Sequence, residues 1–304
     1  MKFLILIRYK NLLMIALVQL LIKYAFLEPF GAVTSLDGFG ISLLIMATVC
    51  IAAAGNIIND INDIETDLVN KPERIIIGKA ISEKLAYNLF IGLNLTGVAL
   101  GFYLSHRVGS PSFFTIFILV SALLYIYATY LKQTFLIGNL IVSLLVAISI
   151  LIAGFFELLP VMTISNRPTQ IVFFKSILDY AIFAFTLNLL REIAKDIEDI
   201  DGDYKAGMNT LPIALGRDRA KNILSVLNFI PLAGIIYYMI SNLYKQQIAV
   251  IYFLLLIIAP LIYICIKTFN AQSKKEFHHI SSMYKLVMLF GMLSLLLYKY
   301  VILN

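Results

Sequence analysis

The chain has 304 residues, of which 61% are apolar and 14% are charged, and its mean hydropathy is +0.90. Soluble domains are about half apolar and about a quarter charged, so this composition excludes an ordinary soluble protein. The net charge of +6 accompanies long apolar segments and gives no support to nucleic-acid binding. The composition predicts an all-α, polytopic membrane protein.

Apolar segments long enough to cross a bilayer recur along the chain, since each crossing needs roughly 20 residues. We predict nine transmembrane helices around a central cavity. Their ranges are about 11–30, 38–58, 84–106, 112–131, 135–157, 171–191, 222–241, 247–267 and 284–303. No change in composition divides the chain, so residues 1–304 are predicted to form a single domain.

Lysine and arginine are concentrated in alternate loops. With a cytoplasmic N-terminus, 18 of the 24 basic residues fall on the cytoplasmic side and five fall outside. Basic residues accumulate in cytoplasmic loops, so this asymmetry predicts an N-in, C-out orientation. We expect a multi-pass protein of the plasma membrane that contacts membrane lipid, and no obligate protein partner.

Ten of the 18 acidic residues lie in two short segments, 60–67 and 192–203. Both segments follow a spacing of four, three and four positions, which places polar side chains on one face of a helix. The residues at these positions are Asn56, Asp60, Asp63 and Asp67, and Glu192, Asp196, Asp199 and Asp203. Pro72 is expected to end the first helix. Both segments lie at predicted cytoplasmic helix ends, so they could face each other across one cavity.

Ordinary helix capping does not explain these acids. They occur at C-terminal helix ends, where the helix dipole disfavours negative charge, and ionisable residues near a membrane span are costly. Carboxylate and amide oxygens without neighbouring Cys or His select hard cations, Mg²⁺ or Ca²⁺. Lys71 and Arg74 follow the first segment, and together with Lys132 these bases favour a diphosphate held by two Mg²⁺ ions. A cation transporter, the alternative, would explain the acids but not these bases.

Three motifs resemble the UbiA superfamily of intramembrane prenyltransferases. "NDINDIETD" (59–67) matches an NDxxDxxxD motif, and "DIDGD" (199–203) matches a DxxxD motif. "YATYLK" followed by "IGN" (127–132 and 137–139) is similar to a tyrosine–lysine segment of that family. The resemblance extends over essentially the whole chain. It implies a prenyltransferase in which Mg²⁺ holds an isoprenyl diphosphate while the allylic carbon is transferred to a lipophilic acceptor.

The resemblance also implies roles for individual residues. The expected metal-binding residues are Asn59, Asp60, Asp63, Asp67, Asp196, Asp199 and Asp203, with Asp196 in a supporting position. By this resemblance, the expected diphosphate-binding residues are Asn59, Arg74 and Lys132. Lys71 and Lys23 are also expected to bind the diphosphate, on the ground of their charge and position in the sequence. The expected catalytic residues are Asp63, Asp199, Lys132 and Tyr127, with Tyr127 lining the site.

Within the superfamily, "REIAKDIEDIDGDYKAGMNTLPIALG" (191–216) looks most like the branch that makes archaeal-type ether lipids. That similarity implies a geranylgeranyl donor and geranylgeranylglycerol phosphate as acceptor. Ile75 stands where the family usually has proline, which affects the expected pose of Arg74. An aromatic quinone precursor, of the 4-hydroxybenzoate or dihydroxynaphthoate type, is the alternative acceptor.

Three further features are less specific. Lys23 lies within a predicted span, and a position facing the cavity is slightly favoured over one that reaches the membrane interface. His278 and His279 are adjacent and point to different faces, so a solvated basic loop is preferred to a metal pair. Cys50 and Cys265 fall inside spans without metal-ligand spacing and are interpreted as packing residues.

Overall fold

The computed structural model describes residues 2–73 and 75–298, which form two compact units. Among the described residues, unit 1 comprises 2–73, 75–132 and 148–178, and unit 2 comprises 133–147 and 179–298. Apart from one isolated bridge between Ile77 and Ile81, the regular structure of the described residues is helical. The all-α prediction is therefore confirmed.

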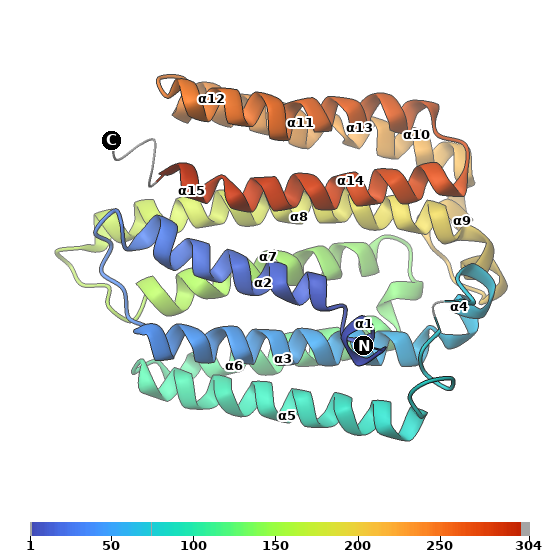
Figure 1. Cartoon of the computed structure of the whole chain (residues 1–304), viewed down its shortest axis with the longest axis horizontal. Coiled ribbons are helices and arrows are strands. Elements are labelled where there is room, and N and C mark those ends of the chain that lie inside the picture. The colour runs from blue at the N-terminus through green and yellow to red at the C-terminus, as the bar shows by residue number, and fades with distance from the viewer. Residues whose placement is uncertain (1, 74, 299–304) are drawn as a thin grey trace. The chain divides into compact units, whose positions relative to one another are not determined.

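The helices follow one another along the chain as labelled in Figure 1. From the N-terminus to residue 133 they are α1 (Lys2–Leu6), α2 (Tyr9–Leu21), the π-helix η1 (Ile22–Leu27), α3 (Gly38–Asn62), α4 (Ile64–Asn70), α5 (Glu83–Arg107), η2 (Pro111–Phe113), α6 (Phe114–Thr129) and η3 (Leu131–Gln133). The remaining helices are α7 (Ile137–Leu158), α8 (Arg167–Lys205), α9 (Leu211–Leu215), α10 (Arg217–Leu227), α11 (Phe229–Tyr238), η4 (Met239–Leu243), α12 (Gln247–Phe253), η5 (Leu254–Ile258), α13 (Ala259–Asn270), α14 (Lys274–Leu293) and α15 (Leu295–Leu297).

Within the described residues, nine helical segments are long and apolar enough to cross a membrane. The multi-pass prediction is confirmed, whereas the N-in, C-out orientation stays a prediction. Two predicted ranges were too short. The sixth segment spans Arg167–Lys205, and the ninth begins at Lys274 rather than at residue 284. Each extension is amphipathic, so its polar residues hid it from a search for continuous apolar sequence.

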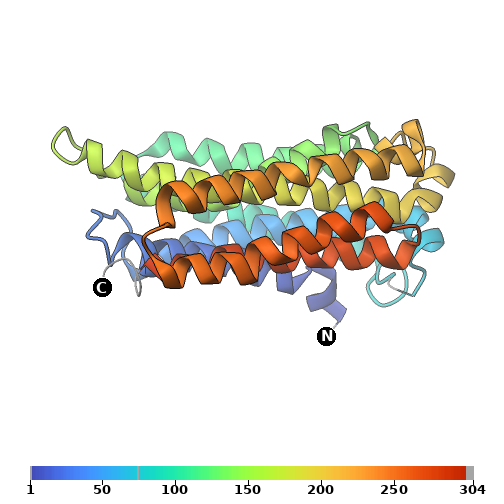
Figure 2. The ribbon, with the colours of Figure 1, turned by 90° about the horizontal axis from the view of Figure 1, so that it is seen from above.

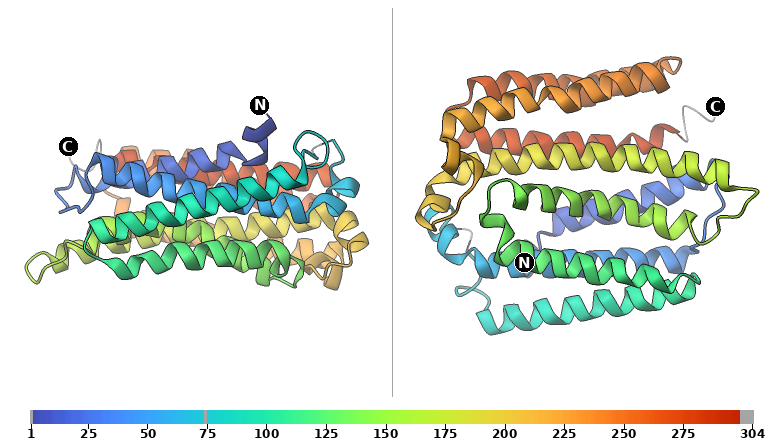
Figure 3. Two further views of the ribbon diagram at one scale, coloured as in Figure 1. Left: turned by 90° about the horizontal axis from the view of Figure 1, so that it is seen from below. Right: turned by 180° about the vertical axis from the view of Figure 1, so that it is seen from behind.

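Unit 1 is organised around α3. Asp37 caps this helix by accepting a hydrogen bond from the Gly40 amide at 2.7 Å. Apolar residues that recur every three or four positions then face α5 and α6 in a buried cluster. Figures 1 and 3 show α5 running alongside α3 and α6 in this unit. The packing holds the C-terminal end of α3 in place, and that end carries the first acidic segment.

The small residue Gly97 of α5 allows α3 and α5 to approach each other closely. A Cβ atom at Gly97 would lie 2.9 Å from the Ala47 carbonyl oxygen and 2.6 Å from the Ile51 side chain. The carbonyl belongs to the backbone and cannot turn away. Small residues at such positions are a common device of membrane helix pairs.

We expect Gly97→Ala to destabilise the protein by about 2 kcal/mol, because overpacking forces backbone shifts. Gly92→Ala is the matched control on the same helix, since its Cβ would meet nothing within 4 Å. This control should be neutral or slightly stabilising, because alanine favours helix. Thermal unfolding in detergent measures both variants, and equal melting temperatures would contradict the close approach.

Unit 2 is built on the C-terminal part of α8. Figure 2 shows the hairpin in which α10, α11 and η4 run back against α12, η5 and α13, followed by α14. Buried apolar residues of α8, including Leu190, Ile193 and Ile197, form one core with Ile280 and Tyr284 of α14. With 3.6 residues per turn, the acids at positions 192, 196, 199 and 203 lie on the opposite face of α8. The core therefore fixes the direction in which the second acidic segment points.

Candidate active site

The first acidic segment surrounds a break between two helices. α3 ends at Asn62, Asp63 adopts φ −94° and ψ 0°, and α4 begins at Ile64. The prediction of one helix continuing to Pro72 was therefore wrong. Aspartate is a poor helix former, and the Asp63 carboxylate is held from two sides at the break. Asn59 donates its side-chain amide to Asp63 Oδ2 at 2.5 Å, and Lys132 forms an ion pair with Oδ1.

Lys132 reaches Asp63 from η3, which follows directly after α6. The side chain of Lys132 is 9% exposed and that of Asp63 is 19% exposed, so this pair is well shielded from water. Tyr127 lies half-buried in the last turns of α6. The structure thus brings together the aspartate and the lysine of two motifs that are far apart in the sequence.

The other predicted site residues of the first acidic segment and its following loop are Asp60, Asp67, Lys71 and Arg74. Asp60 pairs with Arg8 at 2.7 Å, a partner that no pattern in the sequence indicates. Asp67 is half-buried in α4, and its backbone amide donates to the Asp63 carbonyl oxygen at 2.8 Å. Lys71 caps α4 and is half-buried. Arg74 lies outside the described residues.

The second acidic segment lies in unit 2, along one face of α8. Asp203 is 7% exposed, and Asp196 and Asp199 are partly buried. Asn139 of α7 donates its side-chain amide to Asp196 Oδ2 at 2.7 Å. Asn139 is itself buried and belongs to the "IGN" segment of the sequence analysis. The relative placement of the two acidic segments across one cavity stays a prediction.

The N-terminus of α14 lies against the same part of α8. His278 Nδ1 is 3.0 Å from Glu198 Oε1, and Lys274 Nζ is 4.0 Å from Asp199 Oδ1. The interpretation of His278 and His279 as a solvated loop was wrong, because both lie within α14. The S-x-x-E capping box of Ser273 and Glu276 is the sequence signal that could have identified this helix start.

Lys23 differs from its predicted role. It is 1% exposed, and its ammonium donates to the Leu36 carbonyl oxygen at 2.6 Å and pairs with Glu157 at 3.1 Å. Leu36 precedes α3, whereas Asp63 follows it, and 25 residues of helix separate them by roughly 37 Å. Lys23 therefore does not reach a diphosphate held by Asp63. Glu157 has no predicted role, because nothing near it in the sequence indicates its partner.

The donor atoms of both segments fit a hard divalent cation. The residues on each acidic face offer carboxylate and amide oxygens. Within the described residues, however, no group of three or more Asp, Glu, His or Cys is assembled as a metal site. Mg²⁺ usually takes only one or two carboxylates and completes its shell with water and substrate phosphate. The donors present therefore fit a Mg²⁺ ion that binds together with a diphosphate.

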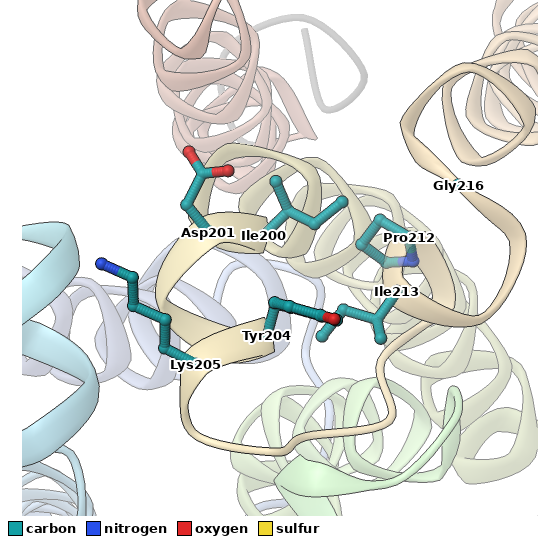
Figure 4. Close-up of a pocket in the computed structure, with 7 residues that line it drawn as sticks. All are labelled: Ile200, Asp201, Tyr204, Lys205, Pro212, Ile213 and Gly216. Carbon is teal, nitrogen blue, oxygen red and sulfur yellow. The ribbon is translucent and has the colours of Figure 1, made fainter.

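A surface pocket of about 400 Å³ lies at the end of α8 in unit 2. Figure 4 shows Asp201, Tyr204 and Lys205 of α8 at this pocket beside Pro212, Ile213 and Gly216. It contains none of the predicted site residues. These α8 residues lie on the face opposite to Asp199 and Asp203, so the pocket is distinct from the acidic face.

Comparisons with known proteins agree with this architecture. The digeranylgeranylglyceryl phosphate synthase of Methanosphaera stadtmanae is 34% identical over 258 residues, covering 83% of this chain and 86% of the relative. The enzyme of the same name from Methanococcoides burtonii is 32% identical over 279 residues, covering 91% of each chain.

Two solved structures share the fold. One is of a digeranylgeranylglyceryl phosphate synthase, with a TM-score of 0.62 and 24% identity over 97% of this chain and 98% of that chain. The other is of a UbiA homologue from Archaeoglobus fulgidus bound to GPP and Mg²⁺. It has a TM-score of 0.57 and 17% identity over 97% of this chain and 99% of that chain. The model of the UbiA prenyltransferase family matches residues 17–300. The chain therefore belongs to the UbiA prenyltransferase family.

Proposed function

We propose that this membrane enzyme transfers a geranylgeranyl group from its diphosphate to geranylgeranylglycerol phosphate in ether-lipid synthesis. The observation that carries the proposal is the first acidic segment, where Asn59 and Lys132 converge on Asp63. Its relatives named digeranylgeranylglyceryl phosphate synthase support the acceptor. The family supports the reaction type.

The acidic residues of the two segments would hold two Mg²⁺ ions. Asn59, Asp60, Asp63 and Asp67 form the first donor set, and Asp199 and Asp203 form the second with Asp196 beside them. Bound Mg²⁺ supplies Lewis acidity that neutralises charge on the leaving diphosphate. Amide and carboxylate oxygens without thiol or imidazole donors support this choice of metal.

The basic residues would hold the diphosphate. Lys132 already lies at the motif aspartate, so a short movement of its ammonium would carry it from Asp63 to a phosphate oxygen. Lys71 follows α4, and Arg74 is assigned the same role by family resemblance. Tyr127 on α6 would line the site near the allylic carbon.

The reaction breaks the bond between C1 of the donor and the diphosphate oxygen. The acceptor hydroxyl oxygen forms the new bond to C1, its proton is released, and the diphosphate leaves with the bonding electron pair. The apolar helices would exclude water from the allylic cation, since water would otherwise capture it.

We further propose that the site faces the cytoplasm in an N-in, C-out protein of the plasma membrane. The placement of 18 of 24 basic residues on one side supports this orientation. We also propose that residues 1–304 act as one UbiA-like domain, because the family match runs through residues of both units.

The test uses the purified full chain in detergent with Mg²⁺ and labelled geranylgeranyl diphosphate. Geranylgeranylglycerol phosphate and 4-hydroxybenzoate are offered in separate reactions. We expect the label in the ether lipid and none after Mg²⁺ is removed with EDTA. Label in the aromatic acid alone would move the function to quinone synthesis, and transfer to neither acceptor would contradict the proposed donor or acceptor class.

A further inference from the structure

The chain turns sharply between α1 and α2 at a residue that rarely makes such turns. Arg8 has φ 52° and ψ 52°, in the left-handed region that side-chain-bearing residues avoid. Its backbone amide donates to the Ile5 carbonyl oxygen at 2.9 Å, and its own carbonyl accepts from Asn11 at 2.8 Å. Surrounding contacts must compensate for the energetic cost of this backbone conformation. Residues held in such strained conformations are concentrated at functional sites.

Contacts from α3 fasten this turn. Leu6 is fully buried in a cluster with Ile57, and the Asn56 side chain donates to the Ile7 carbonyl oxygen at 2.9 Å. One turn further along α3, Asp60 pairs with the Arg8 guanidinium at 2.7 Å. The turn thus delivers one guanidinium to the face of α3 that carries the first acidic segment.

Two carboxylates of that segment therefore already have cationic partners, Arg8 on Asp60 and Lys132 on Asp63. A metal ion arriving alone would have to displace these positive charges. A metal ion arriving with a diphosphate would not, because the diphosphate offers the displaced cations new oxygen partners. A guanidinium group can bind phosphate oxygens in the same bidentate manner in which it binds a carboxylate.

The Arg8 pair is open enough to exchange. The side chain of Arg8 is 40% exposed and that of Asp60 is 23% exposed, so a guanidinium can move without opening the core. The backbone of Arg8 stays fastened through its neighbours, which keeps the guanidinium within reach after it leaves Asp60.

We propose that Arg8 is a positioning residue that holds Asp60 in the free enzyme and transfers to the diphosphate when the metal takes Asp60. This inference rests on the proposed function, because it requires a metal-bound diphosphate at the first acidic segment. Its consequence is that metal and diphosphate each strengthen the binding of the other, by the same factor for both.

The experiment measures binding rather than turnover. Isothermal titration calorimetry with inorganic diphosphate is run in EDTA and again in Mg²⁺, and the binding of Mn²⁺ alone is followed by electron paramagnetic resonance. The variants are Arg8→Gln and Asp60→Asn. Lys10→Gln is the matched control, because Lys10 is an exposed base in α2, two positions after Arg8, and has no ion pair with any described residue.

We expect Arg8→Gln to bind Mn²⁺ alone about fivefold more tightly and metal-free diphosphate about fivefold more weakly. Asp60→Asn should show the opposite change for metal-free diphosphate, because it releases the guanidinium. Lys10→Gln should match the wild type in both titrations. Opposite changes in the affinity for metal-free diphosphate in these two variants would support the exchange of Arg8 between Asp60 and the diphosphate.

Other results would overturn the inference. If Arg8→Gln and Asp60→Asn change metal-free diphosphate binding in the same direction, or not at all, then Arg8 only fastens the turn. If Arg8→Gln does not fold, Asp60→Asn decides the question alone. Tighter binding of metal-free diphosphate by this variant supports the exchange, and unchanged or weaker binding contradicts it. Failure of the wild type to bind diphosphate even with Mg²⁺ would instead overturn the proposed function.

Discussion

Asp63→Asn is expected to lower kcat/KM for prenyl transfer by about 10²–10³-fold, the usual cost of losing a group that stabilises transition-state charge. The substitution keeps the shape of the side chain but removes the carboxylate to which Asn59 and Lys132 converge. Asp199→Asn in the second segment should produce a loss of the same order. Both variants are assayed with labelled geranylgeranyl diphosphate and the phosphorylated acceptor.

The chain offers controls within the same segments. Glu65 lies two positions from Asp63 and is exposed, and the side chain of Asp201 is 73% exposed and lies away from the acidic face of α8. Glu65→Gln and Asp201→Asn remove the same charge and should retain activity within a few-fold. Equal losses in the variants and their controls would show that overall negative charge matters and that the face of the helix does not.

Stability provides a second readout for this prediction. Asp199 shares one helix face with Asp196 and Asp203, and like charges at this spacing repel one another. They also occupy the C-terminal part of α8, where the helix dipole disfavours negative charge. The Lys274 ammonium, 4.0 Å from Asp199 Oδ1, offsets part of this repulsion. Asp199→Asn should therefore change the melting temperature little while activity falls. A lower melting temperature would attribute the lost activity to misfolding.

The transmembrane helices were predictable because the mean hydropathy of a segment long enough to cross a membrane depends only on consecutive residues of the sequence. Nine apolar segments gave nine membrane-crossing candidates within the described residues, and a spacing of four, three and four gave the acidic face of α8. The predicted boundaries were wrong where a helix continues with polar residues. The first ten residues of α14 combine buried Phe277 and Ile280 with charged and polar residues, so a search for continuous apolar sequence passed over them.

The pairing of charged residues was not predictable in the same way. Arg8 and Asp60 are 52 positions apart, and Lys23 and Glu157 are 134 positions apart. Nothing local in the sequence indicates which charges meet, because tertiary packing brings the helices together. The association of Lys132 with the first acidic segment came from its charge and from family resemblance, and periodicity did not contribute to it. Long-range ion pairs thus required the structure, whereas helix faces did not.

Glu157→Gln is expected to destabilise the protein by about 3 kcal/mol, since removing the Glu157 carboxylate leaves the charge of Lys23 buried with only partial compensation. Lys23 and Glu157 are 1% and 0% exposed, and Glu157 Oε2 also accepts a hydrogen bond from the Leu36 amide at 3.2 Å. Glu28 lies 3.3 Å from Lys23 but is 44% exposed, so it compensates only in part. The chain has no tryptophan, so unfolding is followed with a thiol-reactive dye at Cys50 and Cys265.

The double variant Lys23→Met with Glu157→Leu separates the cost of one unpaired charge from the value of the pair. Replacing both partners by apolar residues removes both desolvated charges, so the double variant should be more stable than either single variant. Diphosphate binding by the folded double variant should equal that of the wild type, because α3 separates Lys23 from Asp63. If diphosphate binding is lost while the melting temperature is retained, Lys23 belongs to the site after all. In that case, the buried pair with Glu157 would be a resting arrangement that opens when substrate binds.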